Sequence, residues 1–261
     1  MKKKAGATDI QARHDKRRQK RIREQMIRRY TFFAVLGIIA ILIIMFLTPL
    51  FNVRSVEIVG NNKLTVEEIS AQIGDYTGRN LFSTRKRTIK KKLLDFAYAE
   101  KVNIKKKPIP PTIIVELQER VPAVQISYAE SYIVIDATGI VLEKTQEKLE
   151  GVPICNGINV ASSNLGEQLF MKDEETQKII MSCIESMKKA DIINDITVMS
   201  FEDMTNITFN YQARLDAICG THIDFQRKLA LFKEAVNSNK LTQNSRGTIN
   251  LSTTGKAIYT P

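Results

Sequence analysis

The sequence predicts an α+β protein with a single N-terminal transmembrane helix, a small α+β domain, and a second mixed α/β domain with an extended, mostly antiparallel sheet. Three observations predict this class. No charged residue occurs between Arg29 and Arg54, the next segment has the order strand, helix, helix, strand, strand, and the remainder alternates short strands with two amphipathic helices. The expected divisions are 1–29, 30–51, 52–122 and 123–261.

Residues 30–51 form the expected membrane span. A helix of this length reaches about 33 Å, which matches the apolar thickness of a bilayer. A buried core helix would normally show one polar face, and this segment has none. A cleaved signal peptide would have a shorter charged region and small residues after its apolar run, whereas Thr48-Pro49-Leu50-Phe51-Asn52 follows here. We therefore expect an uncleaved anchor.

Charge is distributed unevenly along the chain. Residues 1–29 hold twelve Lys or Arg and three acidic residues, a net charge of +9, whereas residues 51–122 carry +6 and residues 123–261 carry −4. The positive-inside rule places the arm in the cytoplasm and residues 52–261 on the outer side of the membrane. Anionic lipid accounts for the basic arm. DNA contact by the arm is a minor alternative, because no base-reading motif is present and no nucleic acid is expected.

The first outer domain begins with an alternating strand, Val53–Val59, closed by a turn at Gly60-Asn61-Asn62. Thr65 and Glu68 have the spacing of a capping box, which predicts the start of a helix that ends at Gly74. The strand and this helix are expected to pack on each other.

A second helix is expected from about Thr84 to Tyr98. Its apolar face contains Ile89 and Leu93, and the rest of its surface is crowded by six basic residues: Arg85, Lys86, Arg87, Lys90, Lys91 and Lys92. Such a run is usually a solvated face, and contact with anionic polymer or lipid is the alternative. Because the last three lysines lie off the apolar face, replacing them by Gln should leave folding intact.

Two strands complete this domain, at Val102–Lys106 and Thr112–Glu119. The segment between them, Pro108-Ile109-Pro110-Pro111, is too rich in proline to lie within a sheet.

The second domain opens with a hairpin, Tyr132–Ile135 and Ile140–Leu142, around a turn from Asp136 to Gly139. Residues 143–165 are rich in turn formers. The pattern then predicts two helices and four strands, at Asp173–Ala190, Asp224–Asn239, Ile196–Phe201, Ile207–Tyr211, Gly247–Leu251 and Lys256–Tyr259.

No catalytic or metal-binding set is evident. His222 is the one histidine in the outer region, without a neighbouring His or Cys cluster in the sequence, and no phosphate-binding glycine loop occurs. Cys155, Cys183 and Cys219 lack Cys-x-x-Cys spacing, so we interpret them as small buried apolar residues. We expect no enzyme activity, no metal and no cofactor.

Several short motifs occur in a fixed order behind the anchor. They are Val59-Gly60-Asn61, Gly78-x-Asn80-Leu81-Phe82, Glu119-Arg120-x-Pro122-Ala123, Tyr132-Ile133-Val134-Ile135-Asp136-x-x-Gly139-x-Val141-Leu142, and Val152-Pro153-Ile154 with Gly157. With them the chain resembles the FtsQ/DivIB family of bacterial cell-division proteins. The resemblance implies a POTRA-like domain at 52–122 and a family-type β domain at 123–261.

The resemblance implies a non-enzymatic scaffold at the division septum. Its partners would be small single-span coiled-coil proteins of the FtsL and DivIC/FtsB types, through which it would position or regulate septal peptidoglycan synthases. The alternative is a membrane-anchored protein that binds or modifies cell-wall polymer, using the basic helix and Lys105-Lys106-Lys107.

The partner site is expected at the last strands, because one of them could be a sheet edge that accepts a strand from another chain. The expected contact residues are Thr248, Ile249, Asn250, Leu251 and Tyr259. Asn250 and Ser252 replace the acid and base of the family's usual Ile-Asp-Leu-Arg pattern. The alternative is that the apolar members only fill the core.

Overall fold

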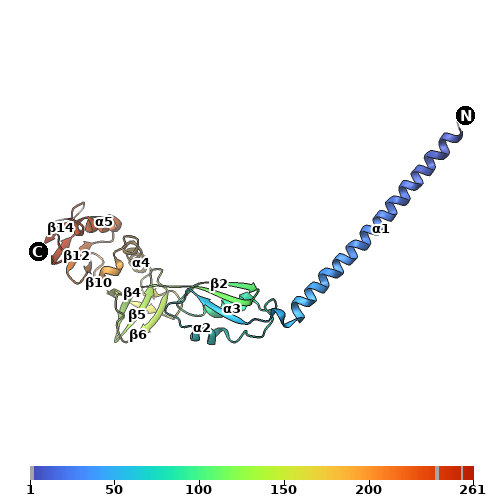
Figure 1. The fold of residues 1–261 in the computed structure, drawn as a ribbon. Helices are drawn as coiled ribbons and strands as arrows, with labels where there is room; N and C mark the ends of the chain where they lie inside the picture. Colours follow the sequence, from blue (N-terminus) through green and yellow to red (C-terminus); the bar gives the residue numbers. More distant parts are fainter. Residues whose placement is uncertain (1–2, 239–240, 254) are drawn as a thin grey trace. The chain divides into compact units, whose positions relative to one another are not determined.

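The structure is a computed structural model that describes residues 3–238, 241–253 and 255–261 (Figure 1). Residues 1 and 2 of the predicted basic arm and Asn239, the last residue of a predicted helix, lie outside this part of the chain. The chain divides into two compact units. The first comprises Met1–Glu57, Asp75–Lys86 and Lys105–Ile114, and the second comprises Ile58–Gly74, Arg87–Ile104 and Val115–Pro261.

Helix α1 runs from Lys3 to Leu47 (Figure 1). Within it, Arg23–Phe46 is long and apolar enough to cross a membrane. The expected span of 30–51 extends too far, because the helix stops at Leu47 and a 3₁₀ turn, η1 (Pro49–Phe51), follows. A residue before proline is pushed out of the helical region, and Thr48 accordingly has an extended backbone.

The C-terminal end of α1 is capped by Asn80. Its Nδ2 donates to the carbonyl oxygens of Met45 at 2.9 Å and Phe46 at 3.3 Å, and its Oδ1 accepts from the backbone N–H of Phe82. The last carbonyls of a helix have no partner within the helix itself. The ring of Phe82 also contacts those of Phe46 and Phe51, with centroids 6.4 and 5.2 Å away. The loop that follows Gly78 is therefore attached to the anchor.

The first domain has the predicted order of strand, helix, helix, strand, strand. Its elements are β1 (Ser55–Val59), α2 (Val66–Ile73), α3 (Lys86–Leu94), β2 (Ala99–Pro108) and β3 (Pro111–Glu119), and the sheet order is β1-β3-β2. The capping box of Thr65 and Glu68 is confirmed. Helix α3 is shorter than predicted, because it ends at Leu94 and the chain has turned into β2 by Ala99. Pro108 is the last residue of β2 and Pro111 is the first residue of β3, so both prolines lie at strand ends and not in the interior of the sheet.

The second domain is built on one nine-stranded sheet with the order β14-β13-β12-β11-β10-β7-β4-β5-β6. Five of its pairs are antiparallel, and β12 with β13, β10 with β7 and β4 with β7 are parallel. The α+β class with a mostly antiparallel sheet is thus confirmed. The strands are β4 (Pro122–Tyr128), β5 (Ser131–Asp136), β6 (Val141–Thr145), β7 (Ile154–Asn156), β10 (Ile196–Ser200), β11 (Ile207–Tyr211), β12 (Leu215–Gly220), β13 (Gly247–Asn250) and β14 (Ile258–Thr260).

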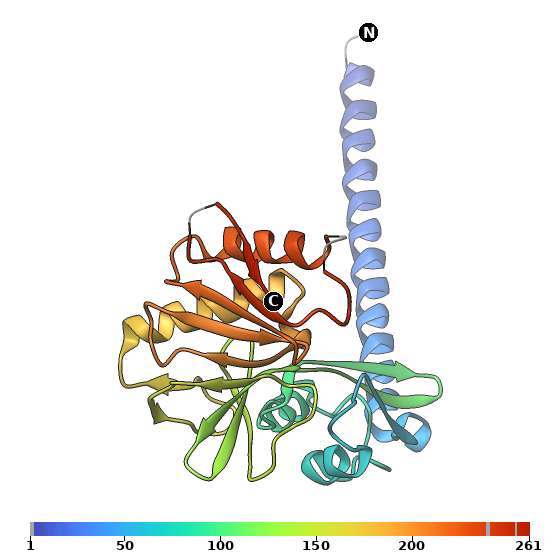
Figure 2. The same ribbon diagram turned by 90° about the vertical axis from the view of Figure 1, so that its left-hand side faces the viewer.

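Smaller elements and two helices complete this domain. Helices α4 (Glu174–Lys189) and α5 (Phe225–Val236) pack against each other and contribute to the core beside the sheet (Figure 2). A separate pair is formed by β8 (Val160–Ser162) and β9 (Phe170–Met171), and a 3₁₀ turn, η2 (Ile193–Asp195), precedes β10. Strands β4, β7, β8, β9 and β12 were not predicted from the sequence.

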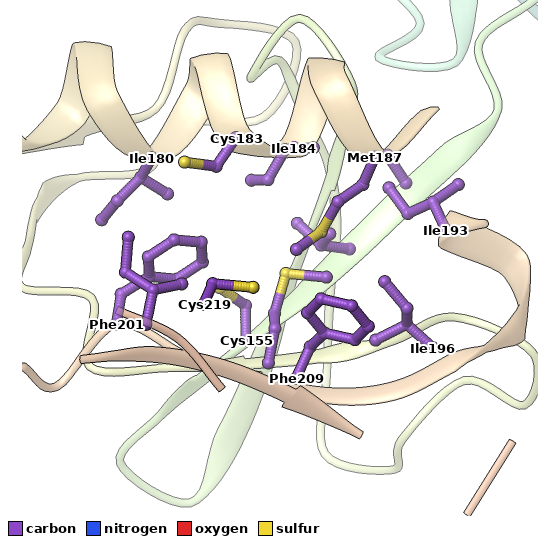
Figure 3. Packing of buried hydrophobic residues seen from close by; sticks show 14 of the residues in the cluster. Cys155, Ile180, Cys183, Ile184, Met187, Ile193, Ile196, Phe201, Phe209 and Cys219 are labelled. Atoms are coloured by element: carbon purple, nitrogen blue, oxygen red, sulfur yellow. The ribbon is translucent and has the colours of Figure 1, made fainter. Parts of the chain in front are cut away.

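The core lies between α4, α5 and the sheet. Helix α4 buries Ile180, Cys183, Ile184 and Met187, the stripe typical of a helix with one core face (Figure 3). The three cysteines are buried and free, which confirms their interpretation as apolar core residues.

Glu119 and Arg120, which end the first domain, each form hydrogen bonds to a distant part of the sequence. The carboxylate of Glu119 accepts hydrogen bonds from the backbone N–H groups of Lys63 at 2.7 Å and Leu64 at 3.0 Å. The neighbouring Arg120 donates from Nη1 to Oδ2 of buried Asp136 at 2.7 Å. These contacts join two motifs that lie apart in the sequence.

The predicted hairpin turn is also confirmed. Oδ1 of Asp136 accepts from the backbone N–H groups of Thr138 and Ile140, and Gly139 has φ +87°. Glycine adopts this conformation without the strain that a Cβ would introduce. Asp136 therefore shapes the turn with one carboxylate oxygen and holds Arg120 with the other.

Candidate partner-binding edge

Strand β14 forms one edge of the nine-stranded sheet (Figure 1). It pairs with β13, with Tyr259 opposite Ile249, and no strand of the described chain lies on its other side. The outer side of an edge strand presents N–H and C=O groups that can pair with another chain. All three residues of β14 are exposed, with Ile258 at 50% and Tyr259 at 36%. The edge therefore offers backbone groups and apolar side chains together.

A groove of about 380 Å³ lies beside this edge. Helix α5 supplies one wall and residues 255–259 supply another. The phenol of Tyr259 donates a hydrogen bond to the carbonyl oxygen of Arg246 at 2.6 Å, which holds the ring in place. The lining residues are Leu231, Glu234, Ala235, Ser238, Leu241, Gly255, Lys256, Ala257 and Tyr259.

Gly247 lets β14 lie close to the start of β13. Its φ is +142°, and a Cβ built there would collide with the carbonyl oxygen of Thr260 and approach Cα of Pro261 to 2.9 Å. A larger residue at this position would have to displace the end of the edge strand.

The structure places the predicted contact residues in different environments. Thr248, Ile249 and Asn250 lie on β13, which is flanked by β12 and β14 and so has no free edge. Ile249 and Leu251 are fully buried, so these two fill the core. Oδ1 of Asn250 accepts from the backbone N–H of Ser252 at 2.9 Å, a local turn contact. Tyr259 is the predicted residue that lies on the edge strand itself.

Sequence reasoning missed the other parts of this edge. Ile258 and the α5 face containing Leu231 and Ala235 carry no motif. The alternation of Lys256–Tyr259 predicted an extended segment, but a local pattern does not say which strand is outermost.

The opposite edge of the sheet, β6, is different in character. It carries Glu143 and the exposed Lys144, and Glu143 forms an ion pair with Lys63 at 3.3 Å. Charged residues on an edge strand discourage the addition of another strand. The uncharged side chains of β14 make it the better acceptor.

The basic residues of α3 do not form one uniform surface. Lys92 donates from Nζ to the carbonyl oxygen of Ile73 at 2.8 Å, at the end of α2, and its own carbonyl oxygen accepts from Gln72. Lys92 therefore makes a structural contact that the prediction for Lys90, Lys91 and Lys92 did not include. Five of the predicted contact residues are exposed: Arg85, Lys86, Arg87, Lys90 and Lys91.

Lys92→Gln is expected to lower the free energy of unfolding by about 1 kcal/mol, because it removes a hydrogen bond from a charged donor. Lys90→Gln is the matched control, and it should change stability by less than about 0.5 kcal/mol as a surface substitution. Urea unfolding of both variants measures the difference. Equal midpoints would show that the contact with Ile73 contributes nothing.

No group of three or more His, Cys, Asp or Glu within the described residues is arranged to hold a metal ion. His222 is exposed. Burial raises the pKa of the thiols of Cys183 and Cys219 to about 12, so both are protonated at neutral pH.

The fold and helix α1 define a class, a protein with a candidate membrane-spanning helix followed by a POTRA domain. Residues 51–120 match the family model described as "POTRA domain, FtsQ-type".

Relatives match over most of the chain. Cell division protein DivIB of Clostridium tetani is 26% identical over 231 residues, covering 87% of this chain and 85% of that protein. DivIB of Clostridium botulinum strain Hall is 26% identical over 251 residues, covering 94% and 93%. Cell division protein FtsQ of Corynebacterium glutamicum is 25% identical over 176 residues, covering 67% and 71%. Over most of its length the chain is therefore similar to the cell-division proteins DivIB and FtsQ, the family that its motifs resemble.

A solved structure was also matched, that of the major extracytoplasmic domain of the trans isomer of DivIB from Geobacillus stearothermophilus. The identity is 12% and the TM-score is 0.33, with 47% of this chain and 96% of that chain covered.

Proposed function

We propose that this protein is a non-enzymatic membrane scaffold of the division machinery that binds an extended segment of a small single-span partner along β14. The observation that carries the proposal is an uncharged, exposed edge strand beside a groove lined by apolar and some polar side chains. Strand addition would use the backbone groups of β14, and alternate side chains of the partner would enter the groove beside α5.

The partners would be proteins of the FtsL and DivIC/FtsB types, and septal peptidoglycan synthases would be reached indirectly through them. Similarity to the DivIB cell-division proteins and the match to the FtsQ-type POTRA model support this choice of partner class. The basic arm supports a cytoplasmic N-terminus, with the POTRA domain and the β domain outside the cell membrane at the septum.

Ile258→Lys is expected to weaken binding of these partners at least about tenfold, because it places a charge on the apolar edge. Ile223→Lys is the matched control, since Ile223 is 62% exposed and lies outside β14. Affinity pull-down from membranes containing the FtsL-type and DivIC-type proteins of the same genome measures binding.

The outcome separates the two candidate functions. If partner binding fell equally in Ile258→Lys and Ile223→Lys, or fell in neither, β14 would be excluded as the binding site. If binding of purified wall polymer, rather than of these proteins, fell when Lys90 and Lys91 were replaced by Gln, the polymer-binding alternative would be favoured.

A further inference from the structure

The tip of the β2–β3 hairpin exposes one large apolar side chain. Ile109 is 81% exposed and lies between Pro108 and Pro110, at the turn that joins the two strands. Lys105 and Lys107 precede it on β2 and are exposed as well. An isolated exposed isoleucine is ordinary on a soluble protein. Ile109 differs from such a residue because it lies close to the end of the candidate membrane-spanning helix.

The tip lies at the end of the sheet where the chain enters the first domain. The backbone N–H of Arg54 donates to the carbonyl oxygen of Pro111 at 2.8 Å, directly after the tip. Arg54 is the seventh residue after Leu47, the end of α1, so the chain spans at most about 25 Å between them. Asn80, which belongs to the same compact unit as the tip, is hydrogen-bonded directly to Met45 near the end of α1. The tip is therefore held near the leaflet from which α1 emerges.

The outer part of this compact unit is strongly basic. Beyond the anchor it contains two acidic residues, Glu57 and Asp75, and seven basic ones: Arg54, Arg79, Arg85, Lys86, Lys105, Lys106 and Lys107. Lys106 points inward, where its Nζ donates to the carbonyl oxygen of Thr84. Burial and the neighbouring Lys86 lower its pKa. The remaining six are exposed.

We infer that the β2–β3 tip is a second membrane contact, in which Ile109 enters the lipid interface and the lysines of β2 bind the phosphates of anionic lipid headgroups. The inference rests on the membrane anchoring proposed above. One apolar side chain binds a bilayer weakly by itself, and stable contact needs a second signal such as a basic patch. The anchor supplies a third contribution, because it keeps the tip at a high effective concentration beside the lipid.

Such a contact would limit the tilt of the first domain on its anchor. The domain would then be held at two points at the same end of its sheet: by Asn80 at the end of α1, and by the tip at the lipid surface.

The test uses the full chain in lipid nanodiscs, in which both faces of the bilayer are open to solvent. A polarity-sensitive fluorophore is attached to Ile109→Cys, and Ile223→Cys carries the same label as the matched control. Labelling is selective because Cys155, Cys183 and Cys219 are buried and their thiols have raised pKa values.

In discs of phosphatidylglycerol, quenching by iodide should be at least about threefold weaker at position 109 than at position 223. Protection should decrease in phosphatidylcholine discs or at high salt, because the headgroup attraction is screened. Replacing Lys105 and Lys107 by Gln should decrease it too, whereas replacing Lys172 and Lys178 by Gln, on the second domain, should not.

Equal quenching at positions 109 and 223 in both lipids would overturn the inference, as would protection that appears only when teichoic acid is added. Failure of the full chain to enter the discs is a different result. It would count against the anchoring itself, and the inference would be lost with it.

Discussion

Replacing Arg120 by Ala is expected to destabilise the second domain by about 3 kcal/mol, because it leaves a buried carboxylate without its ionic partner. Asp136 is 6% exposed, and Arg120 is the basic residue paired with it, at 2.7 Å. The three hydrogen bonds that Oδ1 of Asp136 accepts from its own turn would remain and would not neutralise the charge. Urea unfolding of the detergent-solubilised chain, followed by circular dichroism, measures the change.

Lys63→Ala is the control for this variant. It removes an ion pair with Glu143 at 3.3 Å in which the two side chains are 50% and 25% exposed. Exposed pairs contribute at most about 1 kcal/mol, since water solvates both charges. A loss of stability in Arg120→Ala no larger than in Lys63→Ala would show that the Arg120 contact is not structural.

Gly247→Ala is expected to abolish partner binding at β14. The added Cβ collides with the carbonyl oxygen of Thr260, so the end of the edge strand must move. The positive φ at Gly247 adds backbone strain of about 1 kcal/mol or more. Hydrogen exchange of the amides of residues 258–260 should accelerate, and pull-down of the FtsL-type and DivIC-type partners should fall at least about thirtyfold if the whole edge is lost.

Gly151→Ala is the control that introduces backbone strain at a positive φ without a steric collision. Gly151 also has a positive φ, +73°, but nothing lies within 4 Å of a Cβ built on it. Binding should therefore persist in this variant. Faster exchange in β14 of Gly247→Ala with partner binding at the wild-type level would exclude β14 as the acceptor.

The helices of the second domain were predictable because periodicity is local. Ile180, Cys183, Ile184 and Met187 repeat at helical spacing, and all four are buried on α4. The acidic start and basic end of the same helix suit its dipole. The capping box at Thr65 was predictable for the same reason, since its two partners are three residues apart.

Several strands gave no such signal. In β4, residues 123–126 are all buried, so alternation is absent, and Gln125 satisfies its amide with the carbonyl oxygens of Leu149 and Val152. Strand β7 has three residues. Patterns of this kind are hard to distinguish from loops, because a strand covered on both faces lacks the period of two.

At the candidate site, too, a local sequence pattern could not predict the position of each strand in the sheet. Ile249 and Tyr259 face each other across one strand pair, yet one is buried and the other lies on the edge. The difference arises because β13 pairs in parallel with β12, which places β14 outermost. That parallel pairing joins segments separated by α5. A local sequence pattern identifies the last strands without fixing their order.

Strand β7 has a consequence for the temperature range of the protein. It joins β4-β5-β6 to the strands from β10 to β14, with two residue pairs on one side and three on the other. Few backbone hydrogen bonds hold this junction, so its cohesion depends on apolar burial around Cys155 beneath α4 (Figure 3). Hydrophobic stabilisation weakens on cooling. We expect the sheet to loosen first at β7 in the cold, while the longer antiparallel pairs on each side stay closed.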